Sequence, residues 1–220
     1  MILFRKVHTL YKIVKENLYR RGIRKNLQNK SFSILSNNCW GGGVYEDLGL
    51  AYTTPTVGLF FHGPCYMKFL QRLDYYLSLD LKFIEESVYS IANEKRNTEV
   101  NYYPIALLDD IEIHFLHYHS VTEAIEKWNR RKERINYDNL FVEFGENEMV
   151  DFDLMQQFDK LPFKNKVLLS SKNFKELQSL IWLPQRQNFD DIGDVYTYKN
   201  VWRKEFDVVQ WLNEGFLKKN

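Results

Sequence analysis

The sequence predicts an α/β fold of three layers, in which a mostly parallel sheet is covered by helices on both faces. Two observations carry this prediction. From residue 31 onward, short apolar runs bounded by turn residues alternate with segments of helical periodicity. Such turn-bounded apolar runs are typical of parallel strands that are buried on both faces. We therefore expect one α/β domain over residues 31–220, preceded by a basic amphipathic helix over residues 1–30.

The composition is that of a folded, soluble chain. Of 220 residues, 45% are hydrophobic and 27% charged, and only 15 are Gly or Pro, which excludes long disordered stretches. The net charge is +1, but residues 1–30 hold nine Lys or Arg and one acid, which leaves −7 on the remainder. A mildly acidic body argues against nucleic acid as a partner. The two cysteines are too few for a disulfide scaffold, and a reducing cytoplasm is the simpler expectation.

The first segment, residues 1–30, carries an apolar stripe at helical spacing, formed by Leu3, Val7, Leu10, Val14 and Leu18. Gly22 is expected to interrupt or end this helix. Two interpretations stay open. A basic amphipathic helix can lie on an anionic membrane surface as a peripheral attachment. Alternatively, the stripe packs on the chain's own domain and leaves a solvated basic face.

The remaining elements follow from apolar runs and helix signals. The expected strands are Phe32–Leu35, Thr56–Phe61, Lys82–Glu85, Ile111–Leu116, Leu140–Phe144, Val167–Ser170 and Ser179–Trp182. The expected helices include Pro64–Leu79, Ser120–Arg134, Asp151–Leu161 and Val201–Leu217, the second opening on a capping box of Ser120 and Glu123. Residues 48–67 lack any charged residue over membrane-spanning length, but two prolines interrupt them, so a buried strand flanked by loops is favoured.

The most distinctive candidate site follows the first strand, where two amides, a thiol and three glycines precede a helical pattern. In an open α/β sheet this turn lies at the carboxyl edge, where ligands bind. The helix start would lower the pKa of Cys39 and favour its thiolate. Asn37 and Asn38, with the N–H groups of Gly41 and Gly42, would bind substrate or a developing oxyanion. A purely structural Gly-rich turn with a buried cysteine is the alternative.

Three of the five histidines fall within six residues, after an acidic pair. Strand alternation places His117 and His119 on one face and His114 on the other, so no three-ligand zinc site is expected. His117 is the candidate general base, and Asp110 the carboxylate that orients it. Asp109 and Asp110 also resemble the acidic pair through which many sugar-nucleotide transferases hold a divalent metal. Histidines satisfied inside an aromatic core are the structural alternative.

The helix after Ser120 carries the last group of candidates. Arg130 and Arg134 are four residues apart and share a face, where they could bind a phosphate or carboxylate. Trp128 could stack on a sugar. A charged helix face in contact with water is the alternative use of this run.

Three motifs resemble an uncharacterised bacterial family, a domain of unknown function whose members are often named exopolysaccharide or capsule biosynthesis proteins. The motifs are Ser36-Asn37-Asn38-Cys39-Trp40-Gly41-Gly42, Asp110-Ile111-x-Ile113-His114-Phe115-x-His117-Tyr118 and Trp128-x-Arg130-Arg131-x-x-Arg134-Ile135-Asn136. The first turn is also similar to that of a capsule acetyltransferase family with an SGNH-hydrolase-like fold. This chain departs from that pattern, because Asn37 and Trp40 replace its Gly and Gln and the late Asp-x-x-His motif is absent.

The resemblance implies surface-polysaccharide synthesis, and the residues suggest acyl transfer to a sugar. Cys39 would be the nucleophile, His117 the base and Asp110 its orienting group, with a coenzyme A thioester as a candidate donor. A metal-dependent glycosyltransferase using Asp109 and Asp110 is one alternative. A non-catalytic protein that binds polysaccharide precursors is the other.

Overall fold

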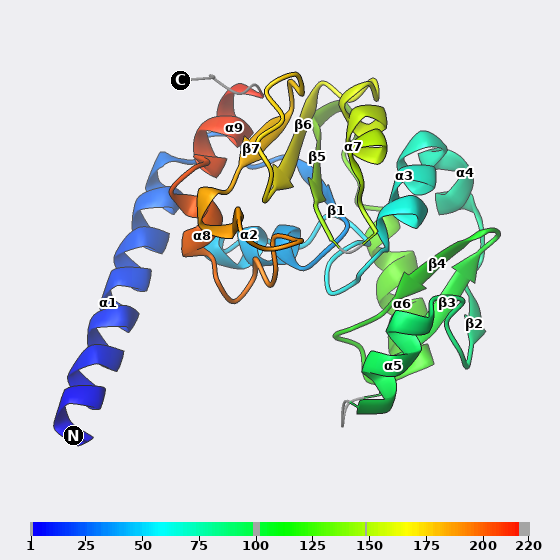
Figure 1. Cartoon of the computed structure of the whole chain (residues 1–220), viewed down its shortest axis with the longest axis horizontal. Helices are drawn as coiled ribbons and strands as arrows, with labels where there is room; N and C mark the ends of the chain where they lie inside the picture. The colour runs from blue at the N-terminus through cyan, green and yellow to red at the C-terminus, as the bar shows by residue number, and fades with distance from the viewer. Residues whose placement is uncertain (1, 99–101, 148, 216–220) are drawn as a thin grey trace.

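The computed structural model describes residues 2–98, 102–147 and 149–215. It confirms the α/β class, with a four-stranded parallel sheet flanked by helices and a helix at the N-terminus (Figure 1). The strand order is β1-β5-β6-β7. Bounds are β1 (Ser33–Ser36), β5 (Leu140–Gly145), β6 (Asn165–Ser170) and β7 (Leu180–Trp182). Because these strands are parallel, their carboxyl ends meet at one edge of the sheet, as the sequence predicted for the turn after β1.

Helices cover both faces of this sheet, because successive strand residues point to opposite sides. Ile34 of β1 packs with α2 (Trp40–Leu48), α8 (Asn200–Arg203) and α9 (Val208–Glu214) around a cluster of tryptophans. Leu35 packs on the other face with α3 (Gly63–Gln71) and α7 (Phe152–Asp159). Both apolar layers are buried, which is the three-layer arrangement expected from the apolar strands.

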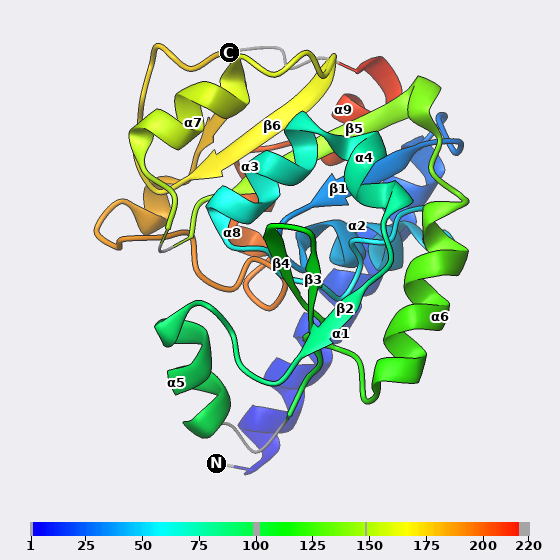
Figure 2. The same ribbon diagram turned by 90° about the vertical axis from the view of Figure 1, so that its right-hand side faces the viewer.

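A second sheet, antiparallel and in the order β2-β3-β4, is inserted between β1 and β5 (Figure 2). It consists of β2 (Lys82–Ile84), β3 (Ile105–Leu108) and β4 (Ile111–His114), and it is accompanied by α4 (Leu73–Ser78), α5 (Ser90–Thr98) and α6 (Val121–Lys132). The sequence did not predict β3. Asp109 and Asp110 form the two-residue turn between β3 and β4, and Asp109 adopts a positive φ of 55°, which Asp tolerates in tight hairpins.

The expected strand Thr56–Phe61 is wrong. Only Phe60 pairs, in an isolated antiparallel bridge with His114, through N–H···O bonds of 2.9 and 3.0 Å. Gly58 has a φ of 76°, outside strand geometry, and the N–H of Leu59 turns back to the carbonyl of Thr56. The antiparallel pairing with β4 therefore does not extend from Phe60 back toward Thr56.

Two expected helices are each divided. Pro64–Leu79 splits into α3 and α4 at Arg72, whose φ of −135° and ψ of 46° are not helical. Val201–Leu217 splits into α8 and α9, and Leu217 lies outside the described residues. The capping box of α6 is confirmed in part, because Ser120 accepts from the N–H of Glu123 while the Glu123 carboxylate accepts from the N–H of His119. Short 3₁₀ turns, η1 (Tyr137–Asn139) and η2 (Pro184–Arg186), complete the chain.

Helix α1 (Ile2–Asn26) runs through Gly22 and projects from the body (Figure 1). Val7, Leu10, Val14 and Leu18 are 47–64% exposed, so the interpretation in which the stripe packs on the domain is wrong for these residues. The side chain of Leu3 lies outside the described part. Among the described residues, no helix combines the length and apolar character needed to cross a bilayer.

An ion-pair network fixes the body-facing side of α1. Arg203 of α8 donates to the carboxylates of Glu16 (2.8 and 2.9 Å) and of the buried Asp47 (2.5 Å), and its guanidinium lies 3.9 Å from the ring centroid of Tyr19. The hydrogen bond from Arg203 lowers the pKa of Glu16 to about 2. Lys199 also pairs with Asp47 at 2.9 Å. These contacts join α1, α2 and α8, while the opposite face of α1 stays exposed.

Candidate functional site

Cys39 and His117 lie against each other although 78 residues separate them in the chain. Cys39 Sγ is 3.2 Å from His117 Nε2. Cys39 is the N-cap of α2 directly after β1, and His117 follows β4. Two backbone bonds bring the segments together: the His117 N–H donates to the Gly58 carbonyl at 3.2 Å, and the Phe61 N–H donates to the Asn37 carbonyl at 2.9 Å. The parallel sheet and the inserted hairpin thus each supply one reactive group.

The two side chains line a cavity of about 310 Å³, which is the size of a small-molecule site. Its walls combine charged groups with tyrosine rings. The remaining lining residues are Gly42, Glu46, Tyr52, Val57, Gly58, Tyr118, Lys127, Arg131 and Tyr196. Glu46 accepts hydrogen bonds from the hydroxyls of Tyr196 at 2.8 Å and Tyr52 at 3.3 Å.

The pKa of Cys39 does not follow the sequence prediction. Burial raises it to about 12, and the negative charges of Asp194 and Glu46 act in the same direction. The expected lowering by the helix start is therefore wrong for the protein without substrate, because desolvation of the thiolate outweighs it. Cys39 is a thiol at neutral pH, placed so that its proton can pass to His117. Cys39 and Cys65 are both free, and Cys65 is buried.

A buried polar network lies beneath Cys39. The Ser36 hydroxyl donates to the Glu143 carboxylate at 2.5 Å, and the Asn38 amide donates to it at 3.4 Å. Asn38 Oδ1 in turn accepts from the Trp40 N–H at 2.8 Å, so Asn38 caps the helix start. Glu143 is fully buried, and burial raises its pKa to about 7. This network holds the turn that carries Cys39.

Asn37 makes a two-point clamp onto the neighbouring strand. Its amide donates to the Gly145 carbonyl at 2.9 Å, and its Oδ1 accepts from the Gly145 N–H at 2.8 Å. The Asn38 amide also turns inward, toward Glu143. Both amides thus bond within the protein, and neither residue lines the cavity, so their roles in substrate or oxyanion binding stay predictions.

The glycines of α2 permit close packing. A Cβ on Gly41 would lie 3.0 Å from Ser36 Cβ, and the Gly41 N–H points to Ser36 Oγ at 3.4 Å. Gly41 is therefore buried against β1 and does not reach the cavity. Gly42 does line the cavity, and its N–H has no acceptor among the described residues. Unpaired N–H groups are normal in a first helical turn.

The residues after Ser120 that line the cavity are not the ones that the sequence predicted. Trp128 is 1% exposed and packs in the core against Phe69 and Phe115, so it cannot stack on a sugar. Arg130 and Arg134 are exposed to solvent and do not line the cavity. The face that lines it instead carries Lys127 and Arg131, again four residues apart.

Asp110 does not orient His117. It stands at the amino end of β4, whereas His117 follows the carboxyl end. Its carboxylate accepts from Lys68 Nζ at 2.6 Å and from the Tyr76 hydroxyl at 2.7 Å, and the Lys68 contact lowers its pKa. Asp109 accepts from the Tyr75 hydroxyl. Within the described part of the chain, no group of three His, Cys, Asp or Glu side chains is placed to hold a metal ion.

The other two histidines of the cluster have separate surroundings. His114 is buried and pairs with the Glu112 carboxylate at 2.6 Å, as a polar pair inside an aromatic layer. Burial acts to raise the Glu112 pKa, but hydrogen bonds from His114, Ser87 and Val88 hold it below its ordinary value. His119 is exposed at the start of α6. Only His117 therefore meets the thiol.

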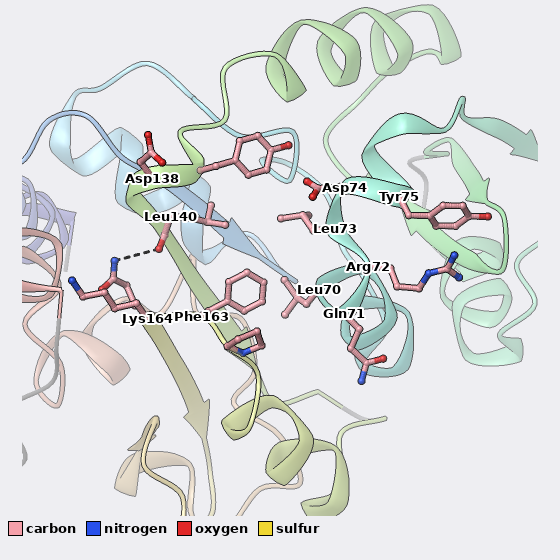
Figure 3. A pocket seen from close by; sticks show the side chains of 13 residues that line it. Leu70, Gln71, Arg72, Leu73, Asp74, Tyr75, Asp138, Leu140, Phe163 and Lys164 are labelled. Atoms are coloured by element: carbon pink, nitrogen blue, oxygen red, sulfur yellow. Dashed lines mark hydrogen bonds between the residues drawn. The ribbon is translucent and has the colours of Figure 1, made fainter.

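Two further cavities lie elsewhere. One of about 400 Å³ shares His117 with the Cys39 cavity and is lined mainly by apolar and aromatic side chains. Another, of about 680 Å³, lies at the opposite edge of the sheet, where β5 and β6 begin. Figure 3 shows Arg72, Asp74 and Lys164 around it, with Leu70 and Phe163 between them. It is remote from the Cys39–His117 pair, and its size alone does not make it the reactive site.

Two residues of the site, Glu143 and Arg131, could have been predicted from the sequence but were not. An acid in the middle of an apolar strand, Glu143, signals a buried polar role. Ala124, Trp128, Arg131 and Ile135 follow helical spacing and are all buried, so this pattern placed Arg131 inward and its neighbours outward. Tyr196 carried no such signal, because it reaches the cavity from a loop.

A comparison with protein families matches residues 10–213 to a family described as a domain of unknown function, DUF1919. The chain belongs to the DUF1919 family. A relative from Haemophilus influenzae, named "Uncharacterized protein", is 31% identical over 217 residues, which is 96% of this chain and 98% of the relative. The family region contains both Cys39 and His117. Neither description carries the exopolysaccharide naming that the motifs suggested.

Proposed function

We propose that the chain is a transferase of bacterial exopolysaccharide or capsule biosynthesis that moves an acyl group from a thioester donor to a sugar hydroxyl. The observation that supports this most is the 3.2 Å contact between Cys39 Sγ and His117 Nε2 at the wall of one cavity. The polysaccharide context rests on the motif resemblance. Tyrosine rings and hydrogen-bonding groups in the cavity suit a hydroxylated ligand.

The reaction proceeds in two balanced steps. Cys39 sulfur attacks the donor carbonyl while its proton passes to His117 Nε2, and the donor thiol leaves with that proton. The acyl group is then a thioester on Cys39. In the second step a sugar hydroxyl attacks this thioester, His117 accepts the hydroxyl proton, and the proton returns to the Cys39 sulfur. The Gly42 N–H is available to donate to the carbonyl oxygen as it gains charge.

Acylation of Cys39 tests the proposal directly. With p-nitrophenyl acetate as a general donor and acetyl-coenzyme A as the expected class, intact-mass spectrometry should find one acetyl group on Cys39. Cys39→Ala should abolish the adduct, and His117→Gln should slow its formation by about 10²–10⁴-fold, the range for general-base catalysis. Cys65→Ala is the matched control and should react normally. An adduct that persists in Cys39→Ala contradicts the proposed nucleophile.

A second candidate is a domain that binds polysaccharide precursors without turnover. The raised pKa of Cys39 favours it, because a buried thiol is inert unless a base removes its proton. The His117 ring has no carboxylate partner among the described residues to orient it. Under this alternative, Cys39→Ala retains the full function of the protein in polysaccharide synthesis, whereas the transferase proposal requires its loss.

The exposed face of α1 supports attachment to the inner face of the cytoplasmic membrane. Leu10, Val14 and Leu18 form an apolar face that is 47–64% exposed, and Arg21 and Lys25 continue that face three and seven residues after Leu18. Each basic residue near an anionic surface gains ~1 kcal/mol, and the apolar side chains add to this. We propose that this face of α1 lies on an anionic lipid surface.

Vesicle co-sedimentation tests this attachment. Vesicles with anionic lipid should sediment the full chain at low salt and release it at high salt, and neutral vesicles should leave it in solution. Leu10→Glu should abolish binding, because it places a negative charge in the apolar face. Glu94→Gln, on α5, is the control. Equal sedimentation of the unchanged chain and Leu10→Glu would refute the attachment.

A further inference from the structure

Arg131 is a buried cation without a buried anion. It is 7% exposed, and its two hydrogen bonds run from Nη1 to the Val57 carbonyl at 3.1 Å and the Tyr118 hydroxyl at 2.6 Å. Both acceptors are neutral. Among the described residues, no carboxylate forms an ion pair with its guanidinium. Buried charges in proteins are normally paired, so the counter-charge for Arg131 is to be sought in a ligand.

The unused donors of Arg131 face the cavity that contains Cys39. A guanidinium has five N–H donors in a rigid fork, and these two bonds leave most of them free. Arg131 lines the cavity, and its guanidinium lies 5.0 Å from the ring centroid of Tyr52, which helps to hold it in place. Lys127, one helical turn earlier, lines the same wall and is paired with Glu123. Among the described residues, this wall therefore carries one cation without a carboxylate partner, Arg131, beside the ion-paired Lys127.

Another part of the cavity lining has different chemistry. Glu46 lies there, hydrogen-bonded to the hydroxyls of Tyr52 and Tyr196, and its negative charge raises the pKa of Cys39. A carboxylate flanked by phenols binds hydroxyl groups and repels anions. A ligand with one anionic group and several hydroxyls would thus bind in one orientation, with its charge at Arg131.

We propose that Arg131 binds the phosphate or carboxylate of an anionic sugar that occupies the Cys39 cavity, with Lys127 adding a second positive charge. The substrate class is a sugar phosphate or a sugar acid. This inference rests on the proposed function in taking the Cys39 cavity as the substrate site. A bidentate contact of this kind requires arginine, because lysine cannot present two parallel N–H groups.

Calorimetric titration of the full chain with three probes tests the inference: glucose 1-phosphate, glucuronate and neutral glucose. We expect at least one charged probe to bind about tenfold or more tighter than glucose, and its affinity to fall as salt rises. Which charged probe binds better separates a phosphate from a carboxylate ligand. Arg131→Gln should remove the preference, while Arg131→Lys should retain only part of it. Arg130→Gln, the exposed neighbour, should bind like the unchanged chain.

The outcomes are decisive even if Arg131→Gln folds poorly, because the preference for charged probes is measured on the unchanged chain. Equal affinity for all three probes, or no binding of either charged probe at millimolar concentration, overturns the inference. Cys39→Ala should bind the charged probes normally. Binding retained in that variant, with no acyl adduct in the unchanged chain, would therefore refute the transferase proposal and leave the anion site standing.

Discussion

Glu143→Gln should make the protein more stable at neutral and alkaline pH. The native carboxyl is fully buried and accepts from Ser36 and Asn38, and its pKa is about 7 in place of the ordinary 4.5. An acid with a raised folded-state pKa contributes stability below the unfolded pKa, and loses that contribution as pH rises through the folded pKa. The free energy of unfolding therefore falls between about pH 4.5 and pH 7 on account of this group.

The magnitude follows from the two pKa values. Their difference, at about 1.4 kcal/mol per unit, gives about 3 kcal/mol of stability lost at neutral pH and above. Gln is nearly the same size and cannot ionise. Its Nε2 can donate to the Ser36 hydroxyl, whose proton can then bond Asn38 Oδ1, 3.2 Å away. The variant should exceed the unchanged protein by less than about 1 kcal/mol near pH 5 and by about 3 kcal/mol near pH 8.

Urea unfolding at several pH values between about 5 and 8 measures this difference. The comparison is between the two proteins at each pH rather than along one curve, so that every group the two proteins share contributes equally to both. Glu143→Ala is the control for side-chain loss and should be less stable at every pH, because it leaves a cavity and unpaired partners. Parallel curves for Glu143→Gln and the unchanged protein would refute the buried charge.

Three further results are expected. Gly145→Ala should cost about 1–3 kcal/mol in urea unfolding and slow acyl transfer, because a Cβ there would meet Asn38 Nδ2 at 2.2 Å. Arg203→Met should cost about 3 kcal/mol by the same assay, since it removes one cation from the buried Asp47, and unchanged stability would show that Lys199 and Arg20 suffice. Iodoacetamide should alkylate Cys39 more slowly than free cysteine at neutral pH, with a rate still rising beyond about pH 9, and a plateau near pH 8 would contradict the raised pKa.

The sequence determined the class of the fold and predicted the position of the candidate site. Apolar strands bounded by turns predicted the parallel sheet, and β1, β5, β6 and β7 lie within a residue or two of the expected bounds. The turn after β1 was identified from residue types alone, since strand ends in such sheets converge. Cys39 and His117 were paired from their chemistry, and the structure places them in contact. The DUF1919 match agrees with the domain of unknown function that the motifs resemble.

Only the tertiary structure decided which side chains surround Cys39 and His117. Asp110 belongs to a hairpin turn, because β3 pairs with β4, and local sequence cannot reveal a strand partner. Tyr196 reaches the cavity from a loop about 150 residues after Cys39 in the chain, and no local pattern reveals that approach. Burial raises the pKa of Cys39, and that burial comes from segments that are distant in the sequence. The helix start, which would lower the pKa, is visible in the local sequence. Residue type and local spacing indicate which side chains can react. Burial and long-range contacts decide what surrounds those side chains, and both arise only when the chain folds.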